Sequence, residues 1–384
     1  MGRGFRGEVS RSNPITNLDQ LANTIQRSLQ LPVAPKFDDV SAETRLARQR
    51  EMLQKVTTAG VDLDSVYSQT LQQIKEQKGD RPRLGMEVLM WVSHAKQPLR
   101  INELLHALAV DVEATDLDPE KIRLQDTVLG SCLGLTMVDQ KTSIVRLIHN
   151  TLKEYLSRPG ILSGAHKILG ETCLAYLNYD QVKRLPANTV QGGLEHMPFL
   201  EYSSSYWAAH ARIELSDWAK TLAVELLSNQ YENHISFKKT WRSYYPNRRY
   251  PFTGLHCASE LGIDGLVAAL IETKSSDINQ VDSRGYTPLM CAVYRENHGA
   301  VKLLLTCDGV DPDKTENSCG QTPLWWATVF GDVEMVRLLT QAGADPNKEA
   351  KDGSTPIMMA SRYSWDMRKL ALLQPREITM SDLV

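Results

Sequence analysis

The feature that most constrains the fold is a short motif that recurs near the C-terminus as TGLHCA, TPLMCA, TPLWWA and TPIMMA. The four copies begin at Thr253, Thr287, Thr322 and Thr355, so they are 34, 35 and 33 residues apart. A repeat of this length is typical of solenoids built from helix pairs, in which each pair buries its apolar side only against its neighbours. The sequence therefore predicts a stack of similar helix pairs over residues 253–384.

Each motif contains the residues that the start of a helix requires. The threonine hydroxyl can accept a hydrogen bond from an amide of the first turn. A proline follows as Pro288, Pro323 and Pro356, at a position where a missing amide hydrogen costs nothing. A second apolar segment then appears as LVAALIE, AVKLLLT and EMVRLLT. Its apolar residues recur at i, i+3 and i+4, which predicts a second helix with one buried side.

The motifs, together with the QAGADPN segment that ends the third unit, resemble the ankyrin repeat. The resemblance covers roughly residues 253–373 and implies three to four repeats. It departs from the family pattern in the first motif, where Gly254 replaces proline. It also departs at the motif histidine, which is present only as His256. The fourth unit lacks a clear second helix.

The ankyrin resemblance implies a scaffold that binds an as yet unidentified partner protein through its turn tips and the concave face of its helices. Carried over to this chain, it implies partner-binding residues at Arg284, Tyr286 and Gln321 in the turns and at Tyr294, Arg295, Trp326, Phe330, Met359 and Tyr363 on the helices. Exposed aromatic and arginine side chains often dominate binding energy. Trp326 and Phe330 lie one helical turn apart, so packing against each other is the alternative.

The middle of the chain has helical patterns and one hairpin pattern. Residues 61–77 and 85–110 carry apolar residues at helical spacing. Residues 138–148 alternate apolar and polar side chains around a DQKT turn, which is typical of a β-hairpin. Helices combined with such a hairpin indicate a winged-helix-like domain over residues 58–160.

The predicted fold class is therefore mostly α, with a winged-helix-like helical domain followed by an α-solenoid of ankyrin repeats. Residues 1–57 are expected to form a flexible arm and an exposed helix, because their start is polar and 41–56 carries a cap and charged residues. Residues 161–252 are expected to form a helical linker domain.

Four segments in the middle, LDSVYSQTLQQI, VLMWVSHAKQPLRINELLHALAV, SCLGLTMVDQ and VRLIHNTLKEYL, resemble the region that follows the NTPase in fungal NACHT-type (STAND) signal-transducing proteins. That resemblance implies the C-terminal half of an NTPase–ankyrin protein and a nucleotide-sensing role for His149. The chain has no GK dipeptide, so it lacks the phosphate-binding GxxxxGK[ST] loop. We therefore favour a structural role for His149. Docking with a separate NTPase chain is the alternative.

The charge balance argues against nucleic acid as the main partner. The formal net charge is −3 at pH 7, whereas proteins that bind nucleic acid or anionic membranes usually carry a basic excess. The stretch FKKTWRSYYPNRRY at 237–250 places aromatic residues between basic ones, a composition that suits single-stranded nucleic acid. A solvated linker helix is the interpretation we favour for this stretch.

The sequence shows no motif for catalysis or metal binding. It contains no GxSxG and no HExxH, and its six cysteines have no zinc-ligand spacing. We therefore expect neither metal nor cofactor. Apolar runs long enough for a transmembrane helix do not occur, which predicts a cytoplasmic or nuclear protein. Together these features predict a non-enzymatic protein–protein interaction scaffold with a regulatory or signalling role.

Overall fold

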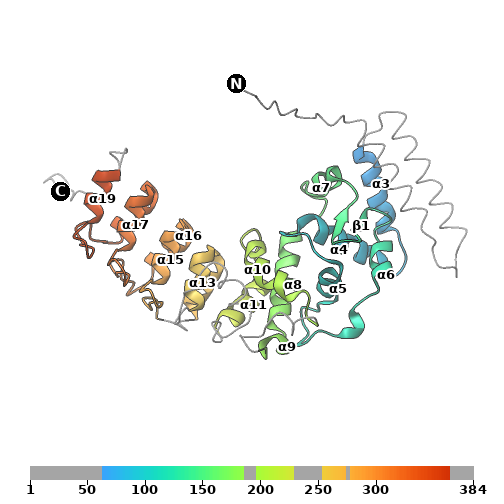
Figure 1. Cartoon of the computed structure of the whole chain (residues 1–384), viewed down its shortest axis with the longest axis horizontal. Helices are drawn as coiled ribbons and strands as arrows, with labels where there is room; N and C mark the ends of the chain where they lie inside the picture. The colour runs from blue at the N-terminus through green and yellow to red at the C-terminus, as the bar shows by residue number, and fades with distance from the viewer. Residues whose placement is uncertain (1–62, 186–195, 229–252, 274–276, 364–384) are drawn as a thin grey trace, which may run out of the picture. The chain divides into compact units, whose positions relative to one another are not determined.

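Helices form most of the regular structure that we describe, and one two-stranded sheet accompanies them (Figure 1). The computed structural model describes residues 63–185, 196–228, 253–273 and 277–363 of the 384-residue chain. The mostly α fold class predicted from the sequence is confirmed.

Contacts divide the described residues into two units. The first takes its residues from 63–109 and 118–165, and the second from 110–117 and from 166 onward. Several expectations from the sequence lie outside the described residues: the arm and helix over 1–57, the basic stretch at 237–250, and the side chain of Tyr363.

The first unit consists of helices around a small hairpin. Its elements are α3 (Leu63–Lys75), α4 (Arg81–His94), α5 (Ile101–Ala109), η1 (Pro119–Lys121), α6 (Gln125–Gly130), β1 (Thr136–Val138), β2 (Val145–Leu147) and α7 (Asn150–Leu156). Helix α3 buries Tyr67, Leu71 and Ile74, which share one side because they are three or four residues apart. The Tyr67 hydroxyl lies 2.8 Å from Thr151 Oγ1 and so ties α3 to α7.

The hairpin is extended by the chain just before α5. Strands β1 and β2 pair antiparallel, with Val138 opposite Val145. The Val145 amide donates to the Leu99 carbonyl at 2.9 Å, and the Ile101 amide donates to the Ser143 carbonyl at 2.8 Å. A helical unit that carries this hairpin at its edge matches the winged-helix arrangement predicted from the DQKT turn.

The second unit begins with helices that pack around aromatic side chains. They are α8 (Ala165–Asn178), α9 (Asp180–Lys183), α10 (Leu200–Ala211) and α11 (Asp217–Ser228). The Tyr176 ring meets Phe199 edge-on, with centroids 5.2 Å apart, and Phe199 stacks on Tyr202 at 5.6 Å. The Tyr202 hydroxyl lies 2.9 Å from Nε2 of the buried His210.

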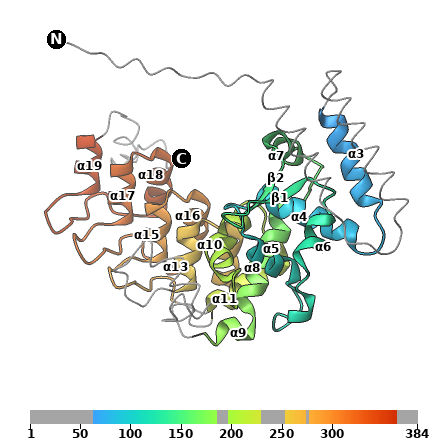
Figure 2. The same cartoon turned by 45° about the vertical axis from the view of Figure 1, so that its right-hand side comes forward.

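The helix pairs of the second unit follow as α13 (Gly254–Leu261), α14 (Asp264–Glu272), α15 (Pro288–Tyr294), α16 (His298–Leu305), α17 (Pro323–Phe330), α18 (Val333–Gln341) and α19 (Pro356–Tyr363). Helices α13, α15, α17 and α19 pack side by side as one layer, and α14, α16 and α18 form the second (Figures 1 and 2). Each pair thus buries its apolar side against the next pair.

The four motif threonines cap the first helices as the sequence predicted. The hydroxyl of Thr287 accepts from the Met290 amide at 3.2 Å, and that of Thr322 accepts from the Trp325 amide at 3.1 Å. Thr253 and Thr355 make the equivalent bonds. In the first motif His256 completes a capping box, because its Nδ1 accepts from the Thr253 amide at 3.2 Å.

The packing of α11 explains why glycine replaces proline in the first motif. Helix α11 lies against α13 and α14, so the stack includes a helix that precedes the first motif. A Cβ atom at Gly254 would stand 2.6 Å from the Leu227 carbonyl oxygen and 2.7 Å from the Leu227 Cβ. Only glycine fits at this contact, which removes the proline found in the other motifs.

A ladder of Asn and Asp side chains joins the loops that follow the second helices. The Asp311 amide donates to Asn279 Oδ1 at 2.8 Å, and the Asp345 amide donates to Asp313 Oδ1 at 2.9 Å. Each loop is therefore hydrogen-bonded to the corresponding loop of the next repeat. Burial raises the pKa of the Asp313 carboxyl. The hydrogen bond from the Asp345 amide lowers this pKa, whereas the negative charges of Asp345 and Asp311 raise it, and the net shift is upward.

Candidate functional site

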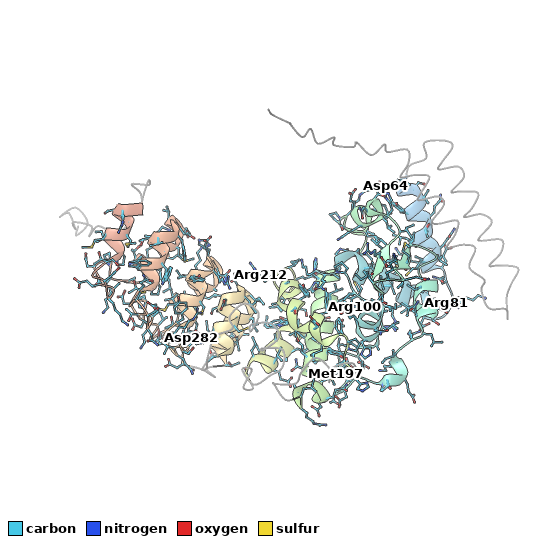
Figure 3. The ribbon with its side chains drawn as sticks, in the orientation of Figure 1. Asp64, Arg81, Arg100, Met197, Arg212 and Asp282 are labelled. Carbon is cyan, nitrogen blue, oxygen red and sulfur yellow. The ribbon has the colours of Figure 1, made fainter. Side chains whose placement is uncertain are left out.

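Buried carboxylates shape the turns between repeats. Asp282 is buried at the turn before α15 (labelled in Figure 3), and its Oδ1 accepts from the amides of Arg284 and Tyr286 at 2.8 and 2.9 Å. In the next turn the buried Glu316 accepts from the Gln321 amide at 3.2 Å. These bonds fix the backbone of three residues that the sequence predicted as turn contacts: Arg284, Tyr286 and Gln321.

Hydrogen bonds between repeats hold successive turns in register. His256 donates from Nε2 to the Tyr286 carbonyl at 2.9 Å, because its Nδ1 already accepts from Thr253. Trp325 occupies the same motif position in the third repeat, where its Nε1 donates to Ser354 Oγ at 3.0 Å. The Trp325 indole therefore replaces the motif histidine as a donor to the next turn. A rigid array of turns results.

Four aromatic rings form a continuous row on the first-helix side of the second and third repeats. We call Tyr286, Tyr294, Trp326 and Phe330 the aromatic strip. The Tyr294 centroid lies 6.4 Å from Tyr286, 5.6 Å from Trp326 and 5.7 Å from Phe330. Trp326 stacks on Phe330 at 5.5 Å. Tyr294 and Phe330 remain 42% and 38% exposed, so the strip presents apolar surface to solvent.

Two guanidinium groups cover the tyrosine end of the strip. Arg284 Cζ lies 4.5 Å from the centroid of the Tyr286 ring, and Arg295 Cζ lies 5.9 Å from that of Tyr294, both within cation–π range. Arg295 also pairs with Glu260, with Nη2 2.9 Å from Oε1. Both arginine side chains are 39% exposed, whereas the carboxylates of Glu260 and Asp282 are 3% and 0% exposed. The guanidiniums are therefore exposed to solvent, and the carboxylates lie behind them.

Equivalent positions of successive repeats make different contacts. Glu260 and Tyr294 each stand seven residues after the capping threonine, and Arg295 and Phe330 each stand eight residues after it. The first pair of repeats joins these positions by the ion pair Arg295–Glu260, and the next joins them by the ring contact Phe330–Tyr294. The face thus changes from charged to aromatic along the stack.

Met359 was expected to be a contact residue, but the structure places it in the core. It is only 7% exposed and packs with Trp325 and Ala350. Trp326 is half-buried and packs against this cluster while it also stacks on Phe330. The packing interpretation of Trp326 is therefore supported, and its role in partner binding stays a prediction. Met359 is buried because α19 packs closely on α17.

Sequence reasoning missed Met358. It occupies the motif-histidine position of the fourth repeat and is 56% exposed, whereas His256, Met290 and Trp325 at the same position are buried. His256 and Trp325 reach the turn of the following repeat. Nothing in the motif itself distinguishes Met358 from Met290. The one feature that could have indicated the exposure of Met358 is its position in the last described repeat.

His149 caps a helix in the first unit. Its Nδ1 accepts from the Thr151 amide at 3.2 Å and lies 2.7 Å from Thr151 Oγ1. It therefore stands at the start of α7, directly after β2. This contact supports a structural role, because it anchors the helix that follows the hairpin.

Other candidate chemistry is sparse among residues 63–363 where they are described. No group of three or more His, Cys, Asp or Glu side chains there has the geometry to hold a metal ion. None of the described helices is both long and apolar enough to cross a membrane. Burial raises the pKa of the Cys132 thiol to about 11 and that of Cys173 well above its usual range, which keeps both thiols protonated and unreactive.

Comparison with protein families assigns both units. Residues 67–165 match the winged helix domain of GPI inositol-deacylase, and residues 220–316 and 308–374 match ankyrin repeats in three copies. The second unit contains a stack of ankyrin repeats. The ankyrin match begins inside α11, in agreement with the packing of α11 on α13 and α14. The segment AVELL in α11 is the sequence signal for this earlier start.

Curated relatives are similar to parts of this chain. Azaphilone pigments biosynthesis cluster protein L of Monascus ruber is 26% identical over 292 residues, which are 65% of this chain and 60% of that protein. Alpha-latrotoxin-Lg1a of Latrodectus geometricus is 36% identical over 112 residues, which are 29% of this chain and 8% of the toxin. The ankyrin repeat and SAM domain-containing protein 6 of Mus musculus is 35% identical over 98 residues, 26% of this chain and 11% of that protein. The chain spans less than two thirds of each of these relatives.

Proposed function

We propose that this protein is a non-enzymatic protein–protein interaction scaffold that grips its partner with the aromatic strip. The observation that carries the proposal is the row Tyr286, Tyr294, Trp326 and Phe330, in which two rings keep more than a third of their area in solvent. Ankyrin repeats support an interaction role in general. The strip supplies a specific surface for it.

The strip has the properties of an energetic centre in an interface. Aromatic and arginine side chains are enriched among residues that dominate binding, and rings lose little conformational entropy when they are already packed. The rings of Tyr294 and Phe330 are held edge to face at 5.7 Å, and the turn that carries Tyr286 is fixed by Asp282. A partner therefore meets preorganised rings, which reduces the entropy cost of association.

The order of the two parts supports a regulatory or signalling role for the scaffold in the cytoplasm or nucleus. A winged helix domain precedes the ankyrin repeats. A separate NTPase chain is one partner that fits this order. Nucleotide-dependent co-purification of an NTPase with the full chain is the expected sign of that partner.

The test of the proposal removes the exposed rings while leaving the stack folded. The variant is Tyr294→Ala/Phe330→Ala, and the matched control is Ile213→Ala/Trp218→Ala, which removes two exposed apolar side chains elsewhere in the second unit. Affinity purification with quantitative mass spectrometry should find proteins that wild type and control capture and the strip variant does not. A purified partner from this set should lose roughly tenfold or more in affinity, because two binding anchors are removed.

Folding is checked by circular dichroism and thermal unfolding of all three proteins. Capture of the same proteins by wild type and by a folded strip variant would contradict the proposal. Loss of the same proteins from the control as well would indicate that the variants act on the stack as a whole.

A further inference from the structure

We infer that the partner contacts the strip through an acidic segment that also carries apolar side chains. This inference rests on the proposed function and specifies the chemistry of the partner. Its basis is the way in which charges are layered on the first-helix and turn side of the stack.

The carboxylates of this side lie behind its cations. Glu260, Asp282 and Glu316 are all buried. Asp282 and Glu316 accept from backbone amides of their own turns, and Glu260 accepts from the guanidinium of Arg295. These three acids therefore serve the fold, and their carboxylates lie behind the guanidiniums and backbone amides rather than at the surface that a partner would touch.

The cations of the same side face solvent. Arg284 and Arg295 are each 39% exposed, and Lys351 and Arg362 in the fourth repeat are also exposed. Each guanidinium offers several donors in a fixed plane, a geometry that matches a carboxylate. The described part of this side thus places two guanidiniums over the tyrosine rings of the strip and two further exposed cations in the fourth repeat.

Three exposed acids on this side do not reverse the pattern. Asp352 accepts from the amide and the hydroxyl of Ser354 at 3.0 and 2.6 Å, Glu349 follows the exposed Lys348, and Glu296 follows α15. A negative partner segment therefore meets more exposed positive than negative charge here.

The rings add a requirement for apolar side chains. Tyr294 and Phe330 expose apolar surface between the two sets of cations. Apolar side chains of the partner would bury this surface, while its carboxylates would pair with the flanking guanidiniums. Charge complementarity of this kind gives orientation and fast association, and apolar burial at the centre gives affinity.

The experiment uses the full chain and three synthetic peptides of equal length. The first alternates glutamate with phenylalanine and leucine, the second replaces the apolar residues by alanine, and the third replaces the glutamates by lysine. Fluorescence anisotropy of the labelled peptides gives each dissociation constant. The first peptide is expected to bind roughly tenfold more tightly than either of the others, and its affinity should fall as salt is added.

A charge-neutral variant tests the role of Arg295 without leaving a buried charge. Glu260→Gln/Arg295→Gln removes one charge of each sign, so the net charge of the chain is unchanged and Glu260 is not left unpaired. Glu334→Gln/Arg337→Gln is the matched control, because it neutralises a similar pair in α18 of the second-helix layer. The first variant should weaken binding of the acidic apolar peptide several-fold, and the control should not. Arg295→Lys keeps the charge but not the planar guanidinium, so it should bind the peptide less tightly than wild type and more tightly than Glu260→Gln/Arg295→Gln.

Several results would overturn the inference. They are equal or tighter binding of the lysine peptide, no binding of any peptide, or unchanged binding by the Glu260→Gln/Arg295→Gln variant. If proteins are still lost from Tyr294→Ala/Phe330→Ala in affinity purification while the acidic apolar peptide does not bind, the interaction function stands and only the acidic chemistry of the partner is wrong.

Discussion

The two units of this protein are stabilised in different ways. In the winged helix unit, contacts join residues that are far apart in sequence, as between Tyr67 and Thr151. In the ankyrin stack, many contacts join a residue to one in the next repeat, as between Asn279 and Asp311 or His256 and Tyr286. The first unit should therefore unfold as one body, whereas damage in the stack should be greatest at the altered repeat and its neighbours.

The largest effect is expected from Trp91→Ala in the winged helix unit. Trp91 is among the largest fully buried side chains described, and its truncation should cost about 3–5 kcal/mol of unfolding free energy. Hydrogen exchange measured by mass spectrometry should show loss of protection in α3, α4, α5 and α7 together. Protection that falls only near Trp91 would show that this unit does not unfold as one body.

A smaller and more local effect is expected from Leu324→Ala in the stack. Leu324 is fully buried in the third repeat, and the change should cost about 2–4 kcal/mol. Exchange should rise most in α17 and α18, less in α15 and α19, and least in α13. Leu289→Ala in the second repeat is the matched variant, and it should move the maximum to α15 and α16. An equal rise along the whole stack in both variants would contradict nearest-neighbour coupling.

The smallest effect is expected from Asp313→Asn in the loop ladder. The asparagine side chain keeps the Oδ1 acceptor for the Asp345 amide. Removing the charge removes the cost of burying it and its repulsion by Asp311 and Asp345. The variant should gain about 0.5 kcal/mol at neutral pH. The folded pKa of Asp313 is raised, so wild type gains stability as the pH falls through that pKa. The difference in unfolding free energy between variant and wild type, measured by denaturant unfolding, should therefore shrink in acid. A difference that does not change with pH would show that the effect does not come from the Asp313 charge.

Much of the fold could be predicted from the sequence because the repeat is local. The motif threonines mark helix caps, and the spacing of 34, 35 and 33 residues marks the stack. The start of the stack could not be predicted in this way, because α11 carries the second-helix pattern without a motif in front of it. The contact of α11 with Gly254 depends on tertiary packing, which the motif sequence does not indicate.

The candidate site was predictable only in part. The turn residues Arg284 and Tyr286 and the rings Tyr294 and Phe330 do meet, because repeats place equivalent positions side by side. Met359 was misplaced because α19 packs closely on α17 and brings Met359 against Trp325 and Ala350. The layering of carboxylates behind guanidiniums was invisible in the sequence, since Glu260 and Arg295 lie in different repeats.

The contact between Gly254 and Leu227 bears on how the ankyrin stack can be excised for study. A fragment that begins at the first motif would lack α11. The surfaces of α13 and α14 that α11 covers would then be exposed, and their apolar side chains would favour aggregation. A cut placed ahead of Asp217 keeps that cover in place. The helix that covers the first repeat is thus α11, which carries the second-helix pattern but has no Thr-Pro motif in front of it.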